Sequence, residues 1–480
     1  MKFEIENLGV IKQAEIELKP LTIFIGHNNR GKTWSAYALS TILGPYAMEQ
    51  YSNAYTAGHV SLLYPPLEKA LQEIAQQGHT TIDLVQFANQ YGETYFQHLA
   101  HFAQDGMQEF MGTKRVSFRQ LAVRLDFDSI KESFLQRLEE MPFERKLFTG
   151  RPRSGALLNL LKEKNQSALY FYTTAQGNLL DEVSTKIVRE FLIFSVFRLL
   201  HNALSNSHYP YAYIFPAERT TYASLPLATL EDSLTIETVE GAIHQRQKKG
   251  YPQAESVASF VRLLLDAFLS GQFERQKQAS KHPMIQKYIE LAELLEKGIL
   301  GGGVDFSLPE PDPLRTLLFH PTGTSQLEMP VVSSMVKELS ALVLYLRYLA
   351  QPHERIIIDE PEMNLHPKTQ VQLMEFLGML VNAGLQILIT THSPYMVDHL
   401  VNLIKAAEQK NKAAIEKKFY LKNAEAFISK EQVSVNLFEN GTCRPILDNE
   451  GLIDWVTFSQ ISDEISDLYF EIDEVAANGS

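Results

Sequence analysis

The chain has 480 residues, of which 45% are hydrophobic, and its 57 acidic and 44 basic side chains give a formal net charge of −13. This length and apolar content suit one large domain or two to three smaller ones, and the acidic balance argues against a surface that is basic overall. The single cysteine, Cys443, excludes a disulfide framework and is typical of a reducing cytoplasm. Residues 1–6 alternate as in a strand and not as in a signal peptide, and charged residues interrupt the most apolar long stretch, Ile187–Leu204, so we expect a cytoplasmic protein without a membrane span.

Three short strands and a glycine-rich loop are predicted at the N-terminal end. Apolar runs rich in β-formers indicate strands over Phe3–Asn7, Ala14–Leu18 and Leu21–Ile25. The segment Gly26–Thr33 follows the third run and fits the pattern G-x-x-x-x-G-K-[ST], and a helix is expected after it over Trp34–Leu43. Strand, loop and helix in this order are the context that a phosphate-binding P-loop requires, so the sequence predicts a nucleotide site here.

The residue types in this loop explain how it would hold a nucleotide. Gly26 and Gly31 let the backbone turn tightly and approach phosphate oxygens without a Cβ in the way. Successive N–H groups and the N-terminus of the following helix present positive dipole to the anion. The Lys32 amine can reach the β- and γ-phosphates, and the Thr33 hydroxyl can ligate Mg²⁺. The candidate nucleotide-binding residues of the loop are Gly26, Asn28, Asn29, Arg30, Gly31, Lys32 and Thr33.

The composition changes over residues 46–208, where tyrosine, glutamine and leucine recur at helical spacing and prolines break the stretch into pieces. We expect a large, mainly helical insertion. Its most basic run contains Arg145, Lys146, Arg151 and Arg153. Two interpretations of that run stay open: a solvated loop, or a contact with phosphate or a partner.

Residues 209–309 are expected to mix strand and helix. A short β run, Tyr211–Phe215, precedes Glu218 and Arg219, which either reach the site or form a structural ion pair. Apolar residues on one face of Val257–Phe268 predict a core helix, and Met284–Lys297 predicts another that three glycines end.

A hairpin and a buried helix are predicted next. Leu314–Phe319 and Gln326–Val331 are expected to pair around a Thr-Gly-Thr turn. The nearly all-apolar stretch Val336–Ala350 predicts a buried helix, and Ser333 and Ser334 directly before it suit its N-cap.

Two further strands are predicted to end in polar side chains. The apolar strand Arg355–Glu360 ends in two carboxylates, those of Asp359 and Glu360. A helix over Val371–Val381 and a strand over Leu385–Ile389 follow, and His392 comes just after that strand.

These three side chains complete the chemistry that a P-loop lacks. A P-loop needs a second carboxylate to hold Mg²⁺ and a group to position the attacking water. Asp359 is the natural partner for Mg²⁺, and Glu360, which alternation points elsewhere, can act as the general base. His392 ends a strand at the sheet edge where α/β proteins bind ligands, which favours a role as γ-phosphate sensor.

Several stretches resemble the motifs of one ATPase group. Gly26–Thr33 matches a Walker A motif, and Ile356–Glu360 matches a Walker B motif with its catalytic glutamate. Glu360–Pro367 resembles the extended Walker B and D-loop, Thr390–Pro394 resembles the switch-histidine loop, and Ser333–Glu338 stands where the signature motif stands. In these motifs the chain resembles the ABC-type ATPases of the SMC, RecF and overcoming-lysogenisation-defect (OLD-like) AAA group.

The resemblance implies an α/β fold with an ABC-type P-loop NTPase core and a large, mainly helical insertion. It implies ATP and Mg²⁺ as ligands, with Glu360 and His392 catalytic and with Thr33 and Asp359 at the metal. Ser333, Ser334 and Asn364 are the further nucleotide contacts that it implies, the serines across a subunit boundary in a homodimer or larger even-numbered oligomer. The expected division is residues 1–45 and 310–445 for the ATPase core, 46–208 for the helical insertion, 209–309 for a mixed segment with a core strand and a helical subdomain, and 446–480 for an acidic C-terminal tail.

Two departures from the group shape the functional hypothesis. The signature lacks the glycine usual after its serine, and too few residues follow His392 for a fused Toprim nuclease. The chain therefore resembles stand-alone ATPase subunits of bacterial anti-phage systems of the PARIS or Septu type, which implies a separate effector protein, a nuclease or toxin, and a trigger that is DNA or phage-derived. The alternative is an SMC- or RecF-like repair ATPase that binds DNA directly; a transporter domain and a non-hydrolysing module fit the motifs less well.

Overall fold

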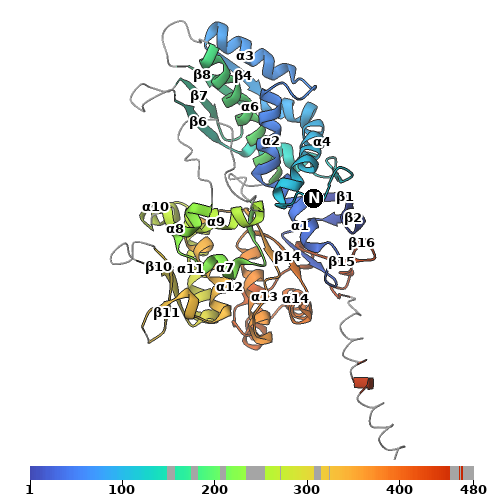
Figure 1. Ribbon diagram of the computed structural model, residues 1–480, viewed down its shortest axis with the longest axis vertical. Coiled ribbons are helices and arrows are strands. Elements are labelled where there is room, and N and C mark those ends of the chain that lie inside the picture. Colours follow the sequence, from blue (N-terminus) through green and yellow to red (C-terminus); the bar gives the residue numbers. More distant parts are fainter. Residues whose placement is uncertain are drawn as a thin grey trace, which may run out of the picture.

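The computed structural model shows an ATPase-like core below and an elongated lobe that extends away from it (Figure 1). It describes residues 1–148, 157–173, 182–205, 212–233, 254–270, 272–307, 315–323 and 325–453, together with 464 and 466–468. Arg151, Arg153 and most of the acidic tail predicted over 446–480 lie outside the described residues.

A nine-stranded sheet forms the centre of the core, in the order β5-β1-β2-β16-β15-β3-β14-β13-β9. The strands β15, β3, β14, β13 and β9 run parallel, so their carboxyl ends meet at one edge, while β1 pairs antiparallel with β2 and β5. The strands are β1 (Lys2–Leu8), β2 (Ile11–Glu17), β3 (Leu21–Ile25), β5 (Ala122–Leu125), β9 (Ala212–Phe215), β13 (Arg355–Asp359), β14 (Gln386–Thr391), β15 (Val433–Glu439) and β16 (Thr442–Pro445).

Alternation along the parallel strands divides the core into two hydrophobic layers. Ile23 and Ile358 point into one layer, whereas Phe24 and Ile357 point into the other, because successive side chains of a strand face opposite sides. A strand covered on both faces is buried along its whole length, which explains why Leu21–Ile25 is apolar apart from Thr22.

Different helices cover the two faces. One layer is closed by α9 (Glu255–Leu269), α11 (Pro283–Leu295), α12 (Ser334–Leu344), α13 (Pro367–Asn382) and α14 (Pro394–Ala407). The other is closed by α1 (Lys32–Leu43), α2 (Pro45–Thr56), α4 (Leu84–Phe110) and α6 (Glu182–Ser205). Shorter helices are α7 (Arg219–Ala223), α8 (Leu227–Ser233), α10 (Gln272–Ala279) and α15 (Lys412–Ile415).

The insertion is mainly helical in its described part, but it also holds strands that the sequence analysis did not predict. β4 (His79–Asp83), β6 (Phe143–Leu147), β7 (Leu158–Lys162) and β8 (Ala168–Tyr172) form a separate four-stranded sheet beside α3 (Pro65–Gln77), α5 (Lys131–Glu140) and α6. In addition, β5 returns to the edge of the main sheet, so the segment 46–208 also contributes to the core. The limits predicted for the domains stay a prediction.

Two of the predicted helices continue into a π-helix at their carboxyl ends. The helix expected over Val336–Ala350 is α12 followed by a π-helix, η4 (Tyr345–Leu349), and α11 continues into a second π-helix, η2 (Glu296–Leu300). An ion pair of 2.5 Å between Arg347 and Glu296 joins the two π-helices. The expected hairpin is present as β11 (Leu317–Pro321) with β12 (Leu327–Glu328), and β10 (Gly302–Phe306) adds a third strand.

No helix among the described residues is long and apolar enough to cross a membrane.

Candidate nucleotide-binding site

The glycine-rich loop leaves the carboxyl end of β3 and begins α1, as the motif requires. Gly26 has φ 137°, and a Cβ on it would collide with the carbonyl oxygen of Phe438 in β15. Gly31 has φ 94°, and a Cβ there would lie 2.6 Å from Ile11. Only glycine suits both positions, so the loop's path follows from its sequence. Asn28, Asn29 and Arg30 are exposed between them, with side chains free of hydrogen bonds within the described chain.

Lys32 lies folded against its own loop. It is 4% exposed, and its Nζ donates to the carbonyl oxygens of Gly26 at 2.9 Å and His27 at 3.0 Å. Burial lowers the pKa of this amine to about 8, although the charges of Glu360 and Asp359 oppose the shift. A buried cation that donates to two neutral carbonyls is poised to exchange them for a stronger anionic acceptor.

Asp359 connects the end of β13 to the loop. Its Oδ1 accepts hydrogen bonds from the Thr33 hydroxyl at 2.9 Å and from the Thr390 hydroxyl of β14. Burial raises the pKa of this carboxyl, and the two hydroxyl donors partly offset the shift. The two predicted metal ligands therefore lie in direct contact, although the sequence separates them by most of the chain.

Glu360 and His392 form the next pair along the edge. Glu360 Oε1 lies 3.3 Å from His392 Nε2, and the hydrogen bond from the imidazole lowers the pKa of the carboxyl. Glu360 has φ 47°, a left-handed backbone that costs on the order of 1–3 kcal/mol in a residue other than glycine. Its N–H is held by the carbonyl and the hydroxyl of Thr390, both at 3.1 Å. This fixed turn aims the carboxylate away from Asp359.

Glu362 is a site residue that the sequence analysis did not assign. Its Oε1 accepts from the Thr391 hydroxyl at 2.8 Å and from the backbone N–H of His392 at 2.6 Å. Burial raises the pKa of this carboxyl. Glu362 thus fixes the loop that carries the histidine, and its place two residues after the paired carboxylates was the only signal in the sequence.

Arg219 resolves the two interpretations left open for the charged pair after β9. It is 1% exposed, and its guanidinium donates to the carbonyl oxygens of Asp359 at 2.7 Å and Glu360 at 3.0 Å. Its Nε forms an ion pair of 2.7 Å with Glu338 in α12. The arginine is therefore both a structural ion pair and a direct support of the two carboxylate-bearing residues.

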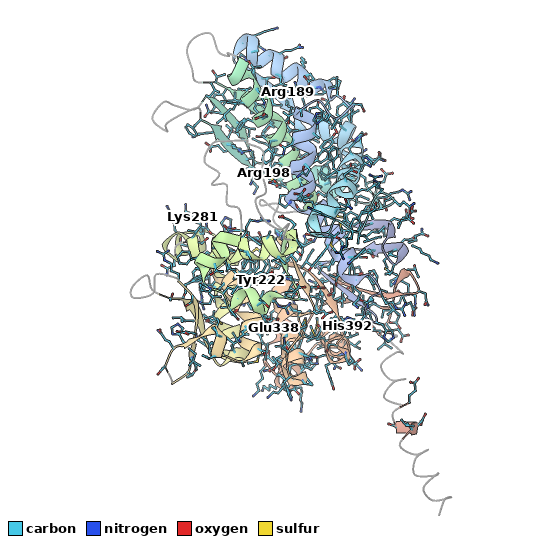
Figure 2. The ribbon with its side chains drawn as sticks, in the orientation of Figure 1. Arg189, Arg198, Tyr222, Lys281, Glu338 and His392 are labelled. Atoms are coloured by element: carbon cyan, nitrogen blue, oxygen red, sulfur yellow. The ribbon has the colours of Figure 1, made fainter. Side chains whose placement is uncertain are left out.

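Glu338 connects this support to the predicted D-loop. Its Oε1 accepts from Asn364 Nδ2 at 2.9 Å, and Asn364 has φ 58°. Burial raises the pKa of Glu338, whereas the Arg219 charge and the Asn364 amide lower it. Figure 2 labels Glu338 and His392 on neighbouring parts of the core. One carboxylate thus joins α12, β13 and the loop after β13.

Ser333 and Ser334 lie apart from this group. Ser333 is the N-cap of α12 and accepts from the backbone N–H of Val336 at 3.5 Å, and both serines are exposed. Within the described residues, neither bonds to the P-loop, Asp359 or His392. The structure therefore brings together Lys32, Thr33, Asp359, Glu360 and His392, but it does not place the serines beside them.

Comparison with known proteins adds a family to this geometry. Residues 144–398 match the family described as "AAA domain, putative AbiEii toxin, Type IV TA system". The chain belongs to this AAA family. The matched residues include α12, β13 and β14, and the P-loop precedes them. No curated protein matches the sequence.

Among solved structures, the chain is similar to heads of SMC proteins. An SMC head bound to the C-terminal winged-helix domain of ScpA shares 11% identity over 93% of this chain and 96% of that one, with a TM-score of 0.34. A Pyrococcus furiosus SMC head with an extended coiled coil, bound to the C-terminal domain of ScpA, shares 11% over 97% and 98%, with a TM-score of 0.34. The Thermotoga maritima SMC head shares 9% over 93% and 97%, with a TM-score of 0.29.

The predicted fold class is confirmed: this AAA-family chain is α/β, with a P-loop NTPase core and a large insertion. The predicted roles of the site residues stay predictions. The donor set fits Mg²⁺ bound together with a nucleotide, since Mg²⁺ takes one or two protein ligands and completes its octahedron with water and phosphate oxygens. The described residues contain no group of three or more His, Cys, Asp or Glu that could hold a metal ion.

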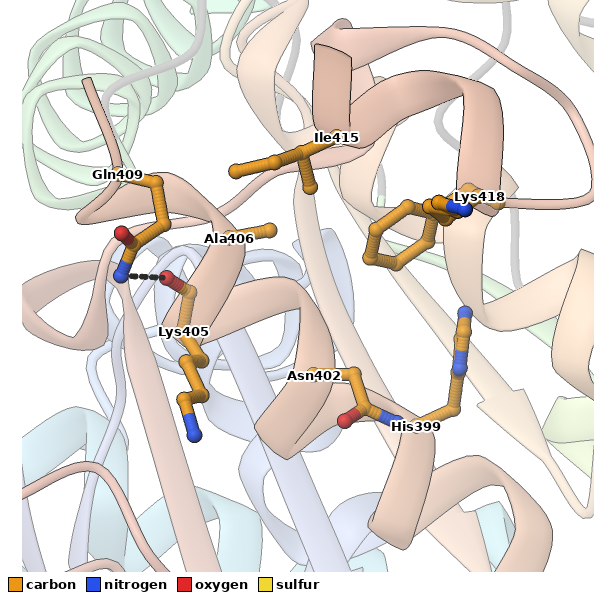
Figure 3. Close-up of a pocket in the computed structure, with 8 residues that line it drawn as sticks. His399, Asn402, Lys405, Ala406, Gln409, Ile415 and Lys418 are labelled. Carbon is orange, nitrogen blue, oxygen red and sulfur yellow. Dashed lines mark hydrogen bonds between the residues drawn. The ribbon is translucent and has the colours of Figure 1, made fainter. Parts of the chain in front are cut away.

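A separate cavity of about 510 Å³ opens between α14 and the segment 415–419 (Figure 3). It is lined by His399, Asn402, Lys405 and Lys418, among others, and none of its residues belongs to the predicted site. Buried Glu375 fixes one side of this cavity, because it accepts from His399 Nε2 at 3.0 Å.

Proposed function

We propose that this protein is the ATP-binding and ATP-hydrolysing switch subunit of a prokaryotic anti-phage defence system, controlling a separate effector such as a nuclease or toxin. The observation that carries the ATPase part is the convergence of the P-loop, Asp359 and the Glu360–His392 pair at one edge of the sheet. Side chains from β3, β13 and β14 meet there because these strands are parallel neighbours.

Each of these residues would have a separate role in phosphoryl transfer. The loop amides and Lys32 would hold the phosphates, while Thr33 and Asp359 would hold Mg²⁺, which neutralises the charge that develops on the transferred group. Glu360 is kept ionised by its hydrogen bond from His392, so it is ready to take a proton from water as general base. His392 orients that carboxylate, and its 26% exposed ring can also contact the γ-phosphate.

The chemical test compares two substitutions. Lys32→Ala should remove most nucleotide affinity, because the loop loses its buried cation. Glu360→Gln should bind ATP normally and hydrolyse it at least about a hundredfold more slowly, since the amide cannot accept a proton. Single-turnover hydrolysis by Glu360→Gln at the wild-type rate would contradict the role given to this residue.

Membership of the AAA family supports the ATPase part of the proposal. The separate effector is proposed because ATP hydrolysis without a second chemistry is most useful as a switch on another protein. Fold alone does not fix function, so the effector and a trigger that is DNA or phage-derived rest on analogy.

Co-purification from the native operon tests the effector. We expect a neighbouring gene product to bind the ATPase and to be held or released according to nucleotide, with Glu360→Gln trapping one of the two states. If no neighbour binds with or without ATP, and the ATPase instead binds DNA with a steep dependence on salt, the alternative of an SMC- or RecF-like repair ATPase should replace this proposal.

A further inference from the structure

The insertion contains cations that have no acidic partner, in a chain that is acidic overall. Arg137, Arg145, Lys162 and Arg198 form no ion pair within the described residues. Two of them are satisfied by backbone oxygens: Arg137 donates to the carbonyl of Ala203, and Lys162 donates to the carbonyls of Glu139 and Met141. Arg145 and Arg198 donate no such bonds to the part of the chain that the structure describes.

These two arginines lie against the same face of α6. The Arg145 guanidinium stacks over the rings of Phe191 and Phe194, 5.2 and 5.1 Å from their centroids. Arg198 follows Phe194 by four residues, so it lies one turn further along the same helix face. Figure 2 shows Arg198 on the side of the insertion that faces the core.

Each of the two guanidinium groups carries a buried N–H without an acceptor. Arg145 Nη1 and Arg198 Nε are buried and have no hydrogen-bond acceptor within the described residues. Burial and the positive charge of Arg198 lower the pKa of Arg145, and no carboxylate opposes the shift. A buried donor on a charged group that lacks an acceptor costs much folding free energy. Two such groups of the same charge side by side also repel each other.

Some other arginines of the insertion are paired with carboxylates within the described chain, unlike Arg145 and Arg198. Arg124 is paired with Glu4 and Glu6, and Arg189 is paired with Glu68 through two hydrogen bonds of 2.9 and 2.8 Å. The pattern at Arg145 and Arg198 therefore calls for an acceptor from outside the described chain.

We propose that Arg145 and Arg198 form a binding site for a phosphate group on the insertion. A phosphate offers several acceptor oxygens and up to two negative charges, which match two guanidinium forks and cancel their repulsion. The aromatic platform under Arg145 holds its fork in place, so little conformational freedom is lost on binding.

A free phosphate compound and the terminal or backbone phosphate of a nucleic acid supply the same chemistry, and the test must separate them. We would measure binding by isothermal titration to the full chain carrying Lys32→Ala, so that the P-loop does not compete. The probes are inorganic phosphate, a single-stranded oligonucleotide with a 5′-phosphate, and the same oligonucleotide without it.

We expect saturable binding of at least one probe, weakened about tenfold or more by Arg145→Gln and by Arg198→Gln, because each removes charge-assisted hydrogen bonds. Arg124→Gln is the matched control and should leave the affinity unchanged, since Arg124 is already paired. Arg145→Lys keeps the charge but not the fork and should weaken binding less than Arg145→Gln. Thermal unfolding of each variant separates lost binding from lost folding.

The three probes distinguish the sources. Binding of inorganic phosphate alone identifies a small phosphate compound as the ligand, and a preference for the phosphorylated oligonucleotide identifies a nucleic-acid end. Equal binding of both oligonucleotides, lost in the two glutamine variants, identifies the backbone. If no probe binds, or if folded Arg145→Gln and Arg198→Gln bind as tightly as their parent, the proposal is wrong.

Discussion

At the scale of single residues, Lys32 is the clearest case in which the fold has tuned a side chain. Its amine is buried among backbone carbonyls, and burial lowers its pKa to about 8. The carboxylates of Glu360 and Asp359 limit the shift but do not cancel it. The site therefore holds a lysine that gives up its proton far more readily than a lysine in water.

This pKa predicts how nucleotide affinity depends on pH. Phosphates favour the charged amine, so the pKa of Lys32 must be higher in the complex than in the free protein. Affinity is then fully present below the pKa of the free protein and falls as the pH rises above about 8. Titration with a non-hydrolysable ATP analogue at pH values from about 7 to about 9.5 measures this dependence. The upper limit lies below the ordinary pKa of lysine, so an unshifted lysine would stay charged over the whole range.

Lys32→Arg is the control, because guanidinium stays protonated throughout this range. Its affinity can be lower than that of the parent, but it should not change with pH. A wild-type affinity that is constant up to a pH of about 9.5 would contradict this prediction. It would mean that the pKa of Lys32 in the folded protein is roughly that of a solvated lysine amine.

At the scale of elements, α12 and β13 are tied by a buried network that the motif itself does not contain. Arg219 links the carbonyls of Asp359 and Glu360 to Glu338, and Glu338 in turn holds Asn364. A shift of α12 would therefore be transmitted to the residues that carry the two carboxylates. This gives the helix that begins at Ser334 a physical connection to the site.

Substitution of the buried Arg219–Glu338 pair separates a role in stabilising the fold from a role in positioning the catalytic residues. Arg219→Met alone should destabilise the fold by about 3–5 kcal/mol, because it leaves Glu338 buried without its partner. Arg219→Met with Glu338→Leu should recover most of that loss, since apolar residues of similar volume can replace a buried ion pair. If Arg219 positions the catalytic edge, kcat of the double variant should stay low while its thermal stability returns. Recovery of both would leave Arg219 with a purely structural role.

The sequence predicted the elements around the site better than it predicted the insertion. The strand before the P-loop and the strand that ends in Asp359 are buried throughout and mostly apolar because helices cover both faces, and such runs are easily recognised. The strands β4, β6 and β8 are short and partly exposed, so their alternation is lost among polar helical sequence, and the short strand β7 is largely buried without alternation. The Arg219–Glu338 pair depends on the packing of α12 against α7, which no local pattern encodes.

At the scale of the whole molecule, the two predicted signature serines stand apart from the other predicted site residues. The described chain places P-loop, Asp359, Glu360 and His392 on one edge, while Ser333 and Ser334 stand exposed at the N-terminus of α12, away from them. Exposed N–H groups at a helix N-terminus suit an anion. In the ATPases that this chain resembles, a second subunit supplies the serine, and the same arrangement here requires an even-numbered oligomer with ATP between subunits.

Mixed oligomers test this arrangement directly. Lys32→Ala cannot bind ATP in its own P-loop, and Ser334→Ala cannot complete the site of its neighbour, so each variant alone should be inactive. In a dimer that contains one of each, the P-loop of the Ser334→Ala subunit faces the intact serine of the Lys32→Ala subunit, and one of the two composite sites is whole. Random mixing in equal amounts should then restore about a quarter of the wild-type rate, because half of the dimers are mixed and each has one working site.

The same mixture made with Ser333→Ala in place of Ser334→Ala identifies which serine makes the contact. Ser333 is also the N-cap of α12, so the effect of its loss on stability must be measured separately. Loss of that cap should cost about 1 kcal/mol of stability, which thermal unfolding reports independently of activity. Restored activity with only one of the two serine variants assigns the contact to that serine. A mixture that stays inactive with both, or a protein that is monomeric with ATP and Mg²⁺ yet fully active at high dilution, would show that each subunit completes its own site, and the exposed serines would then have no part in hydrolysis.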